Sequence, residues 1–137
     1  MDVKIYSDGG ARGNPGPSAS AAFVFNNSTN DLLKLDAKYL GSGTNNQAEY
    51  EGLFLGLKMA SKLGARKATC LLDSELVVKQ LKGEYKVKDS KMKESKKRVD
   101  ELIEDFDSVE FVHIPREENS FADSLVNLIL DSANADS

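Results

Sequence analysis

The sequence of 137 residues has no tryptophan, one cysteine and one histidine. The single cysteine, Cys70, excludes a disulfide framework, and its place in the apolar run "ATCLLD" predicts a small buried thiol in a strand. Without a cluster of cysteine and histidine, the chain lacks the ligands that structural zinc sites use. A zinc centre is therefore not expected.

The sequence also lacks a long hydrophobic run. No segment approaches the roughly 20 apolar residues that span a membrane. The opening "MDVKIYSDGG" has neither the basic start nor the apolar middle of a secretory signal. We therefore expect a soluble, cytoplasmic, monomeric protein with no membrane partner. A chain of this length suits one domain, 1–137, and is too short for two of about 100 to 150 residues each.

The charges are unevenly distributed. Eighteen basic and 22 acidic residues give a net charge of −4 and a pI of about 5.1, which taken alone argues against a nucleic-acid partner. Between Lys79 and Arg98, however, nine basic residues face only three acidic ones. This basic block is either a solvated helix surface or a patch that faces phosphates, and both interpretations stay open.

Alternation and helical spacing predict an α/β protein. We expect strands near 1–7, 18–27, 31–41, 66–73 and 108–114, the fourth of them covered on both faces. We expect helices near 44–63, 75–82, 90–106 and 120–131, the last one capped by Asn119 or Ser120 and followed by a frayed tail at 132–137. This order implies a mixed five-stranded sheet that begins as an antiparallel meander and is flanked by helices.

Four acidic residues fall at the ends of these elements. Asp8 follows the first strand, which we expect to stop at the glycines, and Asp73 ends the fourth strand. Glu49 and Asp123 lie in the first turns of two helices. Each acid alone is well explained as a cap or a surface charge. Together they predict a carboxylate site suited to Mg²⁺ or Mn²⁺, and two such ions about 3.5 to 4 Å apart commonly serve phosphodiester cleavage.

Four segments resemble the signature blocks of type 1 ribonuclease H, in the right order: "YSDGGARGNPGP", "GTNNQAEYEGL", "LLDSELVVKQL" and "PREENSFADSLVN". The resemblance covers nearly the whole chain. It implies the ribonuclease H fold with sheet order 3-2-1-4-5. It also implies an endonuclease that hydrolyses the RNA strand of RNA/DNA hybrids with two Mg²⁺ or Mn²⁺ ions, leaving 5′-phosphate and 3′-hydroxyl ends. The implied catalytic and metal-binding carboxylates are Asp8, Glu49, Asp73 and Asp123.

The resemblance also implies residues that contact the substrate. Glycines beside Asp8 would let the backbone approach a bulky duplex closely. Amide side chains can read a 2′-hydroxyl in the minor groove, and a threonine at a helix start suits a DNA phosphate. The implied substrate-binding residues are Gly9, Gly10, Arg12, Asn14, Thr44, Asn45 and Gln47.

Two features depart from larger members of the family. His113 has about the right separation from Asp123 for a catalytic histidine, but it lies inside the predicted strand "FVHIP", so we interpret it as structural. Arg116 is the better candidate for that catalytic position, where it would bind phosphate or stabilise charge. The chain also lacks the basic, tryptophan-bearing protrusion, as compact members do, and the block from Lys79 to Arg98 could partly replace it.

Two other functions compete with hybrid cleavage. One is a noncatalytic ribonuclease H-like module that binds hybrid or double-stranded RNA. The other is a resolvase-like or transposase-like enzyme that processes DNA. The four acids disfavour the first, and the resemblance of the blocks around Asn14 and Asn45 to hybrid-reading motifs disfavours the second. Cleavage of double-stranded RNA as well as hybrid stays open.

Overall fold

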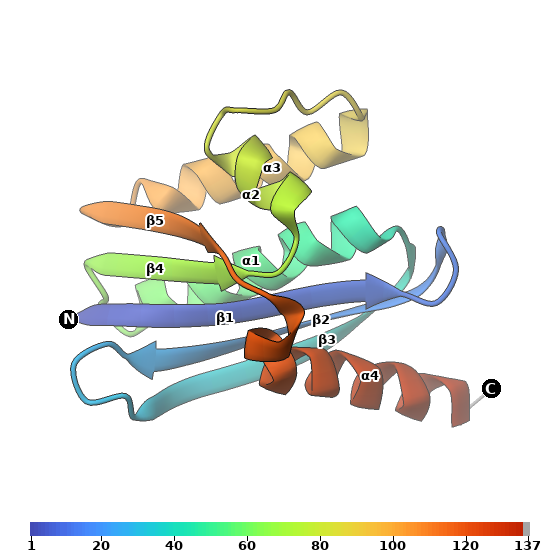
Figure 1. The fold of residues 1–137 in the computed structure, drawn as a ribbon, viewed down its shortest axis with the longest axis horizontal. Coiled ribbons are helices and arrows are strands. Elements are labelled where there is room, and N and C mark those ends of the chain that lie inside the picture. Colours follow the sequence, from blue (N-terminus) through green and yellow to red (C-terminus); the bar gives the residue numbers. More distant parts are fainter. Residues whose placement is uncertain (136–137) are drawn as a thin grey trace.

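One five-stranded mixed sheet forms the centre of the molecule, with helices packed on both faces (Figure 1). The computed structural model describes residues 1–135. The elements in chain order are β1 (Asp2–Ala11), β2 (Gly16–Asn26), β3 (Leu32–Gly43), α1 (Asn45–Lys62), β4 (Lys67–Leu72), α2 (Glu75–Leu81), α3 (Ser90–Ile103), β5 (Ser108–His113), the 3₁₀ turn η1 (Arg116–Asn119) and α4 (Ser120–Ala135).

The strand order is β3-β2-β1-β4-β5, which confirms the predicted fold. The first three strands form an antiparallel meander, and β4 and β5 run parallel to β1. The pairing of β1 with β4 ends where Tyr6 lies opposite Leu71, whereas its pairing with β2 continues to Ala11. The last part of β1, which contains Asp8, therefore projects beyond the end of β4.

Four expectations about these elements are wrong. β1 does not stop at the glycines, because Gly9 and Gly10 continue the ladder with β2, so Asp8 lies within the strand. Burial alternates along β4, so only one face of that strand is buried, and Asp73 follows the strand instead of ending it. The last helix reaches Ala135, so 132–135 is helical and not frayed, while 136–137 of the predicted tail lies outside the described residues.

The two faces of the sheet bury different helices. α1 covers one face over the larger core, which includes Ile5, Leu53, Leu57 and a fully buried Cys70, as expected for that thiol. Burial in this apolar core raises the pKa of the Cys70 thiol. α4 covers part of the opposite face over a smaller core, formed by Ala19, Ala21, Val126 and Leu130. No helix within residues 1–135 has the length and apolar character needed to cross a membrane.

Gly9 sets how closely α1 approaches β1. A Cβ atom added there would lie 2.1 Å from the carbonyl carbon and oxygen of Ala48, and one added at Gly52 would lie 2.5 Å from the carbonyl oxygen of Asp8. Both glycines thus let the first turns of α1 rest directly on the strand. Gly9 thus serves the packing of α1, and its close approach to a duplex stays a prediction. As a result, Glu49 is brought beside Asp8.

Replacement of Gly9 with alanine tests this contact. The new methyl group collides with backbone atoms that cannot rotate away, so Gly9→Ala should lower the free energy of unfolding by about 3 kcal/mol or more. Gly10→Ala is the matched control, because its Cβ would lie 3.8 Å from Val126 Cγ1, an ordinary contact. Urea unfolding of both variants gives the comparison. Equal stabilities would show that α1 does not depend on this approach.

Candidate active site

Three carboxylates meet at the rim of the sheet beyond the end of β4. Asp8 comes from β1, Glu49 from the second turn of α1 and not from the first turn as expected, and Asp73 from the bend that follows β4. One carboxylate oxygen from each residue lies within 4.8 Å of the other two. Segments far apart in the sequence thus place three acids within reach of a single cation.

Burial makes this cluster costly without a cation. Asp8 is 6% exposed and Glu49 is 7% exposed. Burial, with the nearby Asp73 carboxylate, raises the pKa of Asp8 to about 7. Burial and the Asp8 carboxylate raise the pKa of Glu49 well above its usual value. Near neutral pH, the cluster therefore tends to hold protons when no metal is bound.

One buried carboxylate oxygen of the cluster has no partner within residues 1–135. Glu49 Oε2 is buried and has no hydrogen-bond partner among the described residues. A buried carboxylate oxygen of this kind is costly unless it is paired, protonated or bound to a metal. Three carboxylates are hard oxygen ligands of the type that Mg²⁺ and Mn²⁺ prefer. The residues present therefore fit a divalent cation.

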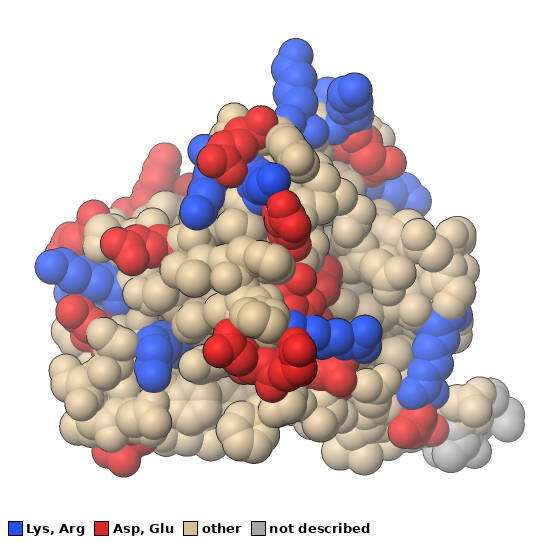
Figure 2. Space-filling view, viewed as in Figure 1, with Lys and Arg blue, Asp and Glu red and all other residues tan. Residues whose placement is uncertain are grey.

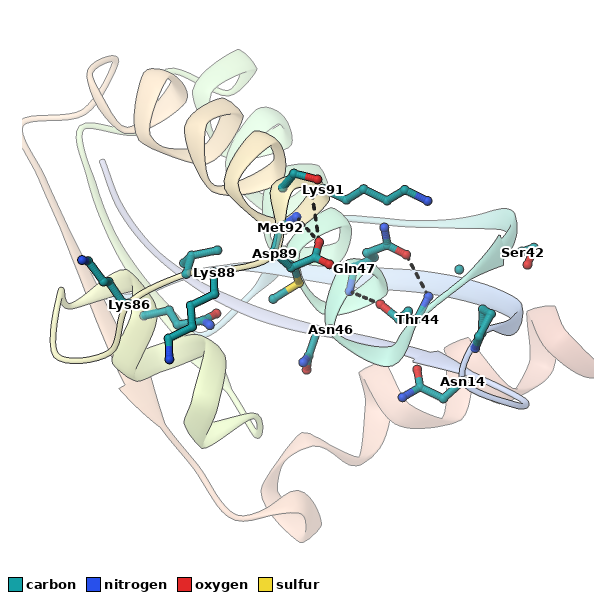
Figure 3. Close-up of a pocket in the computed structure, with 15 residues that line it drawn as sticks. Asn14, Ser42, Thr44, Asn46, Gln47, Lys86, Lys88, Asp89, Lys91 and Met92 are labelled. Carbon is teal, nitrogen blue, oxygen red and sulfur yellow. Dashed lines mark hydrogen bonds between the residues drawn. The ribbon is translucent and has the colours of Figure 1, made fainter.

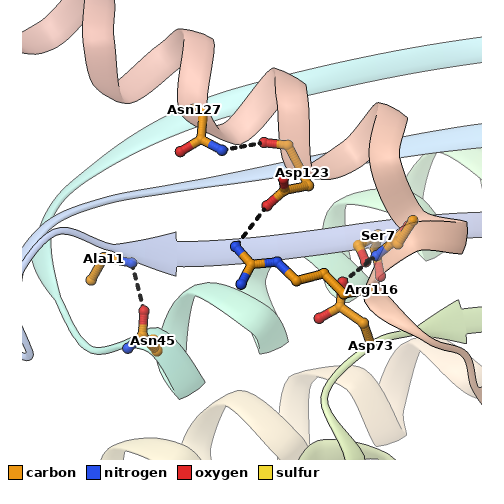
Figure 4. A network of polar contacts seen from close by, with 8 residues as sticks. Ser7, Ala11, Asn45, Asp73, Arg116, Asp123 and Asn127 are labelled. Atoms are coloured by element: carbon orange, nitrogen blue, oxygen red, sulfur yellow. Dashed lines mark hydrogen bonds and ion pairs between the residues drawn. The ribbon is translucent and has the colours of Figure 1, made fainter.

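Asp123 lies near this cluster but makes a different contact. Its Oδ1 atom accepts a hydrogen bond from Nη2 of Arg116 at 3.3 Å, as the Arg116 side chain reaches across to α4 (Figure 4). This pairing raises the pKa of the mostly exposed Arg116 guanidinium. Of the four acids predicted to converge, three form the compact cluster, and the fourth is paired with an arginine at its edge.

These groups line one cavity of about 440 Å³. Its lining includes all four acids, Arg116 and Gly10. Acidic side chains gather at the middle of this face, over the start of α4, while basic side chains project above α2 and α3 (Figure 2). The cavity is thus acidic, with two arginines, Arg12 and Arg116, among its lining residues.

The predicted substrate-binding side chains form a hydrogen-bonded framework beside the cavity. Asn45 Oδ1 accepts from the Ala11 backbone N–H at 2.8 Å, and the Asn45 backbone N–H donates to Asn14 Oδ1 at 3.1 Å. Thr44 and Gln47 cap the start of α1 reciprocally, so each side chain accepts from the other residue's backbone N–H. These contacts hold the β1–β2 loop and α1 in a fixed relation.

Arg12 also lines the same cavity. Its guanidinium forms an ion pair with Asp131 near the end of α4. Both side chains are substantially exposed, so this pair adds little stability and can open without much cost. Its predicted contact with substrate stays a prediction.

His113 is the last residue of β5 and pairs with Leu72 in the ladder, as the predicted strand required. Its side chain is exposed, and it is not among the residues that line the carboxylate cavity. Arg116, in contrast, reaches into the cavity from η1. The geometry therefore favours Arg116 for a role at the site, as the sequence did.

The sequence did not identify Asn119 as part of the site. Its position before a helix predicted a cap, but its Nδ2 atom donates to the backbone carbonyl of Ser7 at 2.8 Å and to Asp73 Oδ2 at 2.9 Å. Pro115, in an extended conformation, precedes η1, and η1 leads directly into α4. Asn119 is therefore not the N-cap of α4. A buried tertiary contact leaves no local signal in the sequence. An asparagine before a helix looks the same whether its side chain caps the helix or contacts a distant segment.

Comparisons with known proteins agree with this geometry. A model of the family described as "Reverse transcriptase-like" matches residues 6–129. The solved N-terminal RNase H domain of Rv2228c from Mycobacterium tuberculosis is 40% identical, with a TM-score of 0.90, and covers 93% of this chain and 97% of that one. RNase H1 from Halobacterium salinarum is 36% identical with a TM-score of 0.92 over 96% and 99% of the two chains.

A third solved structure, LC11-RNase H1 in complex with an RNA/DNA hybrid, is 39% identical with a TM-score of 0.89 over 96% and 98% of the chains. The chain belongs to the reverse transcriptase-like family and, within it, to type 1 ribonuclease H. It spans 36% of the length of the mycobacterial bifunctional protein, at 41% identity, and 65% of the full ribonuclease HI of Halobacterium salinarum, at 37% identity.

Removal of the charge at Asp8 tests the electrostatic strain of the metal-free cluster. Because the pKa of Asp8 is about 7 in the folded protein, above its unfolded value near 4, the folded state binds more protons between these pH values. This group therefore favours folding most below about pH 4, and its contribution is lost as the pH rises through 7. In chelator at pH 8, Asp8→Asn should be more stable than the parent by about 2 to 4 kcal/mol.

Thermal unfolding from pH 4 to 8 measures this difference, which should shrink toward zero at the acid end. The exposed Asp36 provides the control variant, Asp36→Asn, whose difference from the parent should stay near zero throughout. If the difference in unfolding free energy between Asp8→Asn and the parent does not change with pH, the surroundings of Asp8 do not destabilise its charged form.

Proposed function

We propose that this chain is an endoribonuclease that hydrolyses the RNA strand of RNA/DNA hybrids, giving 5′-phosphate and 3′-hydroxyl ends. The observation that carries the proposal is the cluster of Asp8, Glu49 and Asp73, with its unpaired buried oxygen. The names of its relatives add support, since they include a ribonuclease HI and an RNase H1 in complex with an RNA/DNA hybrid.

The cofactor that suits this cluster is a pair of Mg²⁺ or Mn²⁺ ions. Asp8, Glu49 and Asp73 would hold them, with Asp123 at the edge. When bound, such a pair activates water and stabilises the leaving oxygen of a phosphodiester. The buried positions of Asp8 and Glu49 keep these carboxylates in place and exclude bulk water from them.

Arg116 would act on the phosphate itself. Its guanidinium stays charged near neutral pH and cannot serve as a general base. Its single hydrogen bond to Asp123 leaves other donors that can reach an incoming anion. We therefore assign Arg116 to binding the scissile phosphate and stabilising the negative charge that develops on it.

A second cavity, of about 670 Å³, suits the strand that is not cut. One side carries Thr44, Asn14 and Gln47, and the other carries the lysines of the segment between α2 and α3, as Figure 3 shows. Hydroxyl, amide and ammonium donors suit the phosphates of a nucleic-acid backbone. We propose that this cavity, the lysine groove, binds the DNA strand while the carboxylate cavity acts on the RNA.

Only part of the basic block is available for this role. Three of its basic side chains are already paired with acids: Lys79 with Glu75, Lys96 with Asp100, and Arg98 with Glu51. Three others line the groove: Lys86, Lys88 and Lys91. The first set therefore belongs to a helix surface, and we assign the second set to contacts with phosphates.

Replacement of one carboxylate tests the catalytic proposal. Asp73→Asn should lower the rate of RNA cleavage in a matched hybrid by at least about 100-fold, because the amide has lost the negative charge that a cation requires. Gel analysis of labelled hybrid, double-stranded RNA and duplex DNA, each with Mg²⁺, Mn²⁺ or chelator, gives rate and products. Asp107→Asn, which breaks an exposed ion pair with Arg66, is the control.

The outcomes separate the candidate functions. Metal-dependent cutting of hybrid that Asp73→Asn abolishes supports the proposal. Tight binding of hybrid with no cutting by the parent would instead favour a noncatalytic module, and cutting of duplex DNA would favour a DNA-processing enzyme. Full activity of Asp73→Asn would refute the assignment of the carboxylates.

Neutralisation of the three groove lysines tests the second cavity. In the cleavage-deficient Asp73→Asn background, replacement of Lys86, Lys88 and Lys91 with alanine should weaken hybrid binding. It should also reduce the slope of log affinity against log salt by about 2 to 3, since each phosphate contact contributes about one unit. Fluorescence anisotropy at several salt concentrations measures both. Lys96→Ala should change the slope little, and an unchanged slope in the triple variant would exclude the groove.

A further inference from the structure

Asn119 joins three separate segments at the back of the carboxylate cluster. It is the last residue of η1, is 1% exposed, and lies 112 residues from Ser7 and 46 from Asp73 in the sequence. One amide nitrogen donates to both the Ser7 carbonyl and the Asp73 carboxylate. The bend after β4 is thereby tied to β1 immediately before Asp8.

Asp73 needs such a tie because of its position. It follows the end of β4, so the sheet ladder does not fix its backbone, and its carboxylate faces those of Asp8 and Glu49. Repulsion among the three would turn Asp73 outward in the absence of a cation. A neutral amide donor opposes this movement without adding a positive charge that would compete with a metal. A carboxylate has about four acceptor sites, so the hydrogen bond to Oδ2 leaves Asp73 able to ligate.

We propose that Asn119 is a positioning residue that holds Asp73 in its metal-binding orientation before any cation arrives. This inference rests on the proposed metal-dependent function. Asn119 acts through Asp73 and does not itself touch the substrate. It also anchors the segment from which both Arg116 and Asp123 extend. One buried amide thus fixes the position of these two residues relative to the carboxylate cluster.

Divalent-cation affinity tests this inference directly. Partners that orient a metal ligand typically change metal affinity by 10- to 100-fold when they are removed. Asn119→Ala should therefore weaken Mn²⁺ binding by about that factor in isothermal titration calorimetry of the full chain, performed well below its unfolding temperature. Hybrid cleavage by the variant should recover partly at high Mn²⁺, so that the half-saturating metal concentration rises more than the maximal rate falls.

The control separates positioning from general stability. Ser18→Ala removes a side-chain hydrogen bond to the Gly41 carbonyl, which joins β2 to β3 away from the cluster. It should lower the unfolding temperature and leave Mn²⁺ affinity unchanged. Asn119→Ser, which replaces the amide with a single hydroxyl donor on a side chain too short to bridge both acceptors, provides a second variant if Asn119→Ala does not fold.

Each outcome has a distinct meaning. Weakened Mn²⁺ binding by either folded Asn119 variant, with unchanged binding by Ser18→Ala, supports the inference. Parental Mn²⁺ affinity in a folded Asn119 variant overturns it, even if that variant is less stable. Parental Mn²⁺ affinity in Asp73→Asn would refute the proposed metal site itself, and so distinguishes failure of the proposed function from failure of the role of Asn119.

Discussion

The mutual repulsion of three closely spaced carboxylates, two of them buried, is the constraint on which the rest of the structure depends. Asp8, Glu49 and Asp73 lie close enough to share one cation, and burial raises the pKa values of the first two. A protein gains nothing in stability from such an arrangement. The fold maintains it through backbone contact at Gly9, which fixes Glu49, and through the Asn119 amide, which restrains Asp73.

The surroundings of this cluster divide into a rigid framework and exposed cationic groups. Asn14, Asn45, Thr44 and Gln47 are joined by hydrogen bonds that connect the β1–β2 loop to the start of α1. The groove lysines, in contrast, extend from the segment between α2 and α3 and from the first turn of α3. A framework of this kind can fix the register of a duplex, while flexible ammonium groups supply affinity that depends on salt.

The sequence predicted the elements well because their signals are local. Alternation in β1 and the helical spacing in α1 and α3 each act within a few residues, and the resemblance of the four signature blocks then implied the sheet order. The physical role of Gly9 could not be predicted in the same way, since it depends on Ala48, a residue brought near only by folding. The continuation of β1 through two glycines also depends on its partner strand.

The site was predictable in its acids and less so in their contacts. Positions at element ends selected all four carboxylates, yet nothing local indicated that Asp123 pairs with Arg116 while the other three converge. Asn119 was interpreted as a cap because a cap and a buried tie have the same sequence pattern. Side-chain direction at a loop follows from tertiary packing, and a single sequence does not encode it in a readable form.

Crystals of the protein grown with Mn²⁺ offer the most direct measurement, because anomalous scattering locates manganese without assumptions about its ligands. The account predicts an anomalous peak within coordinating distance of Asp8, Glu49 and Asp73. Manganese bound elsewhere on the chain, with these three carboxylates free of metal at neutral pH and saturating concentration, would contradict it.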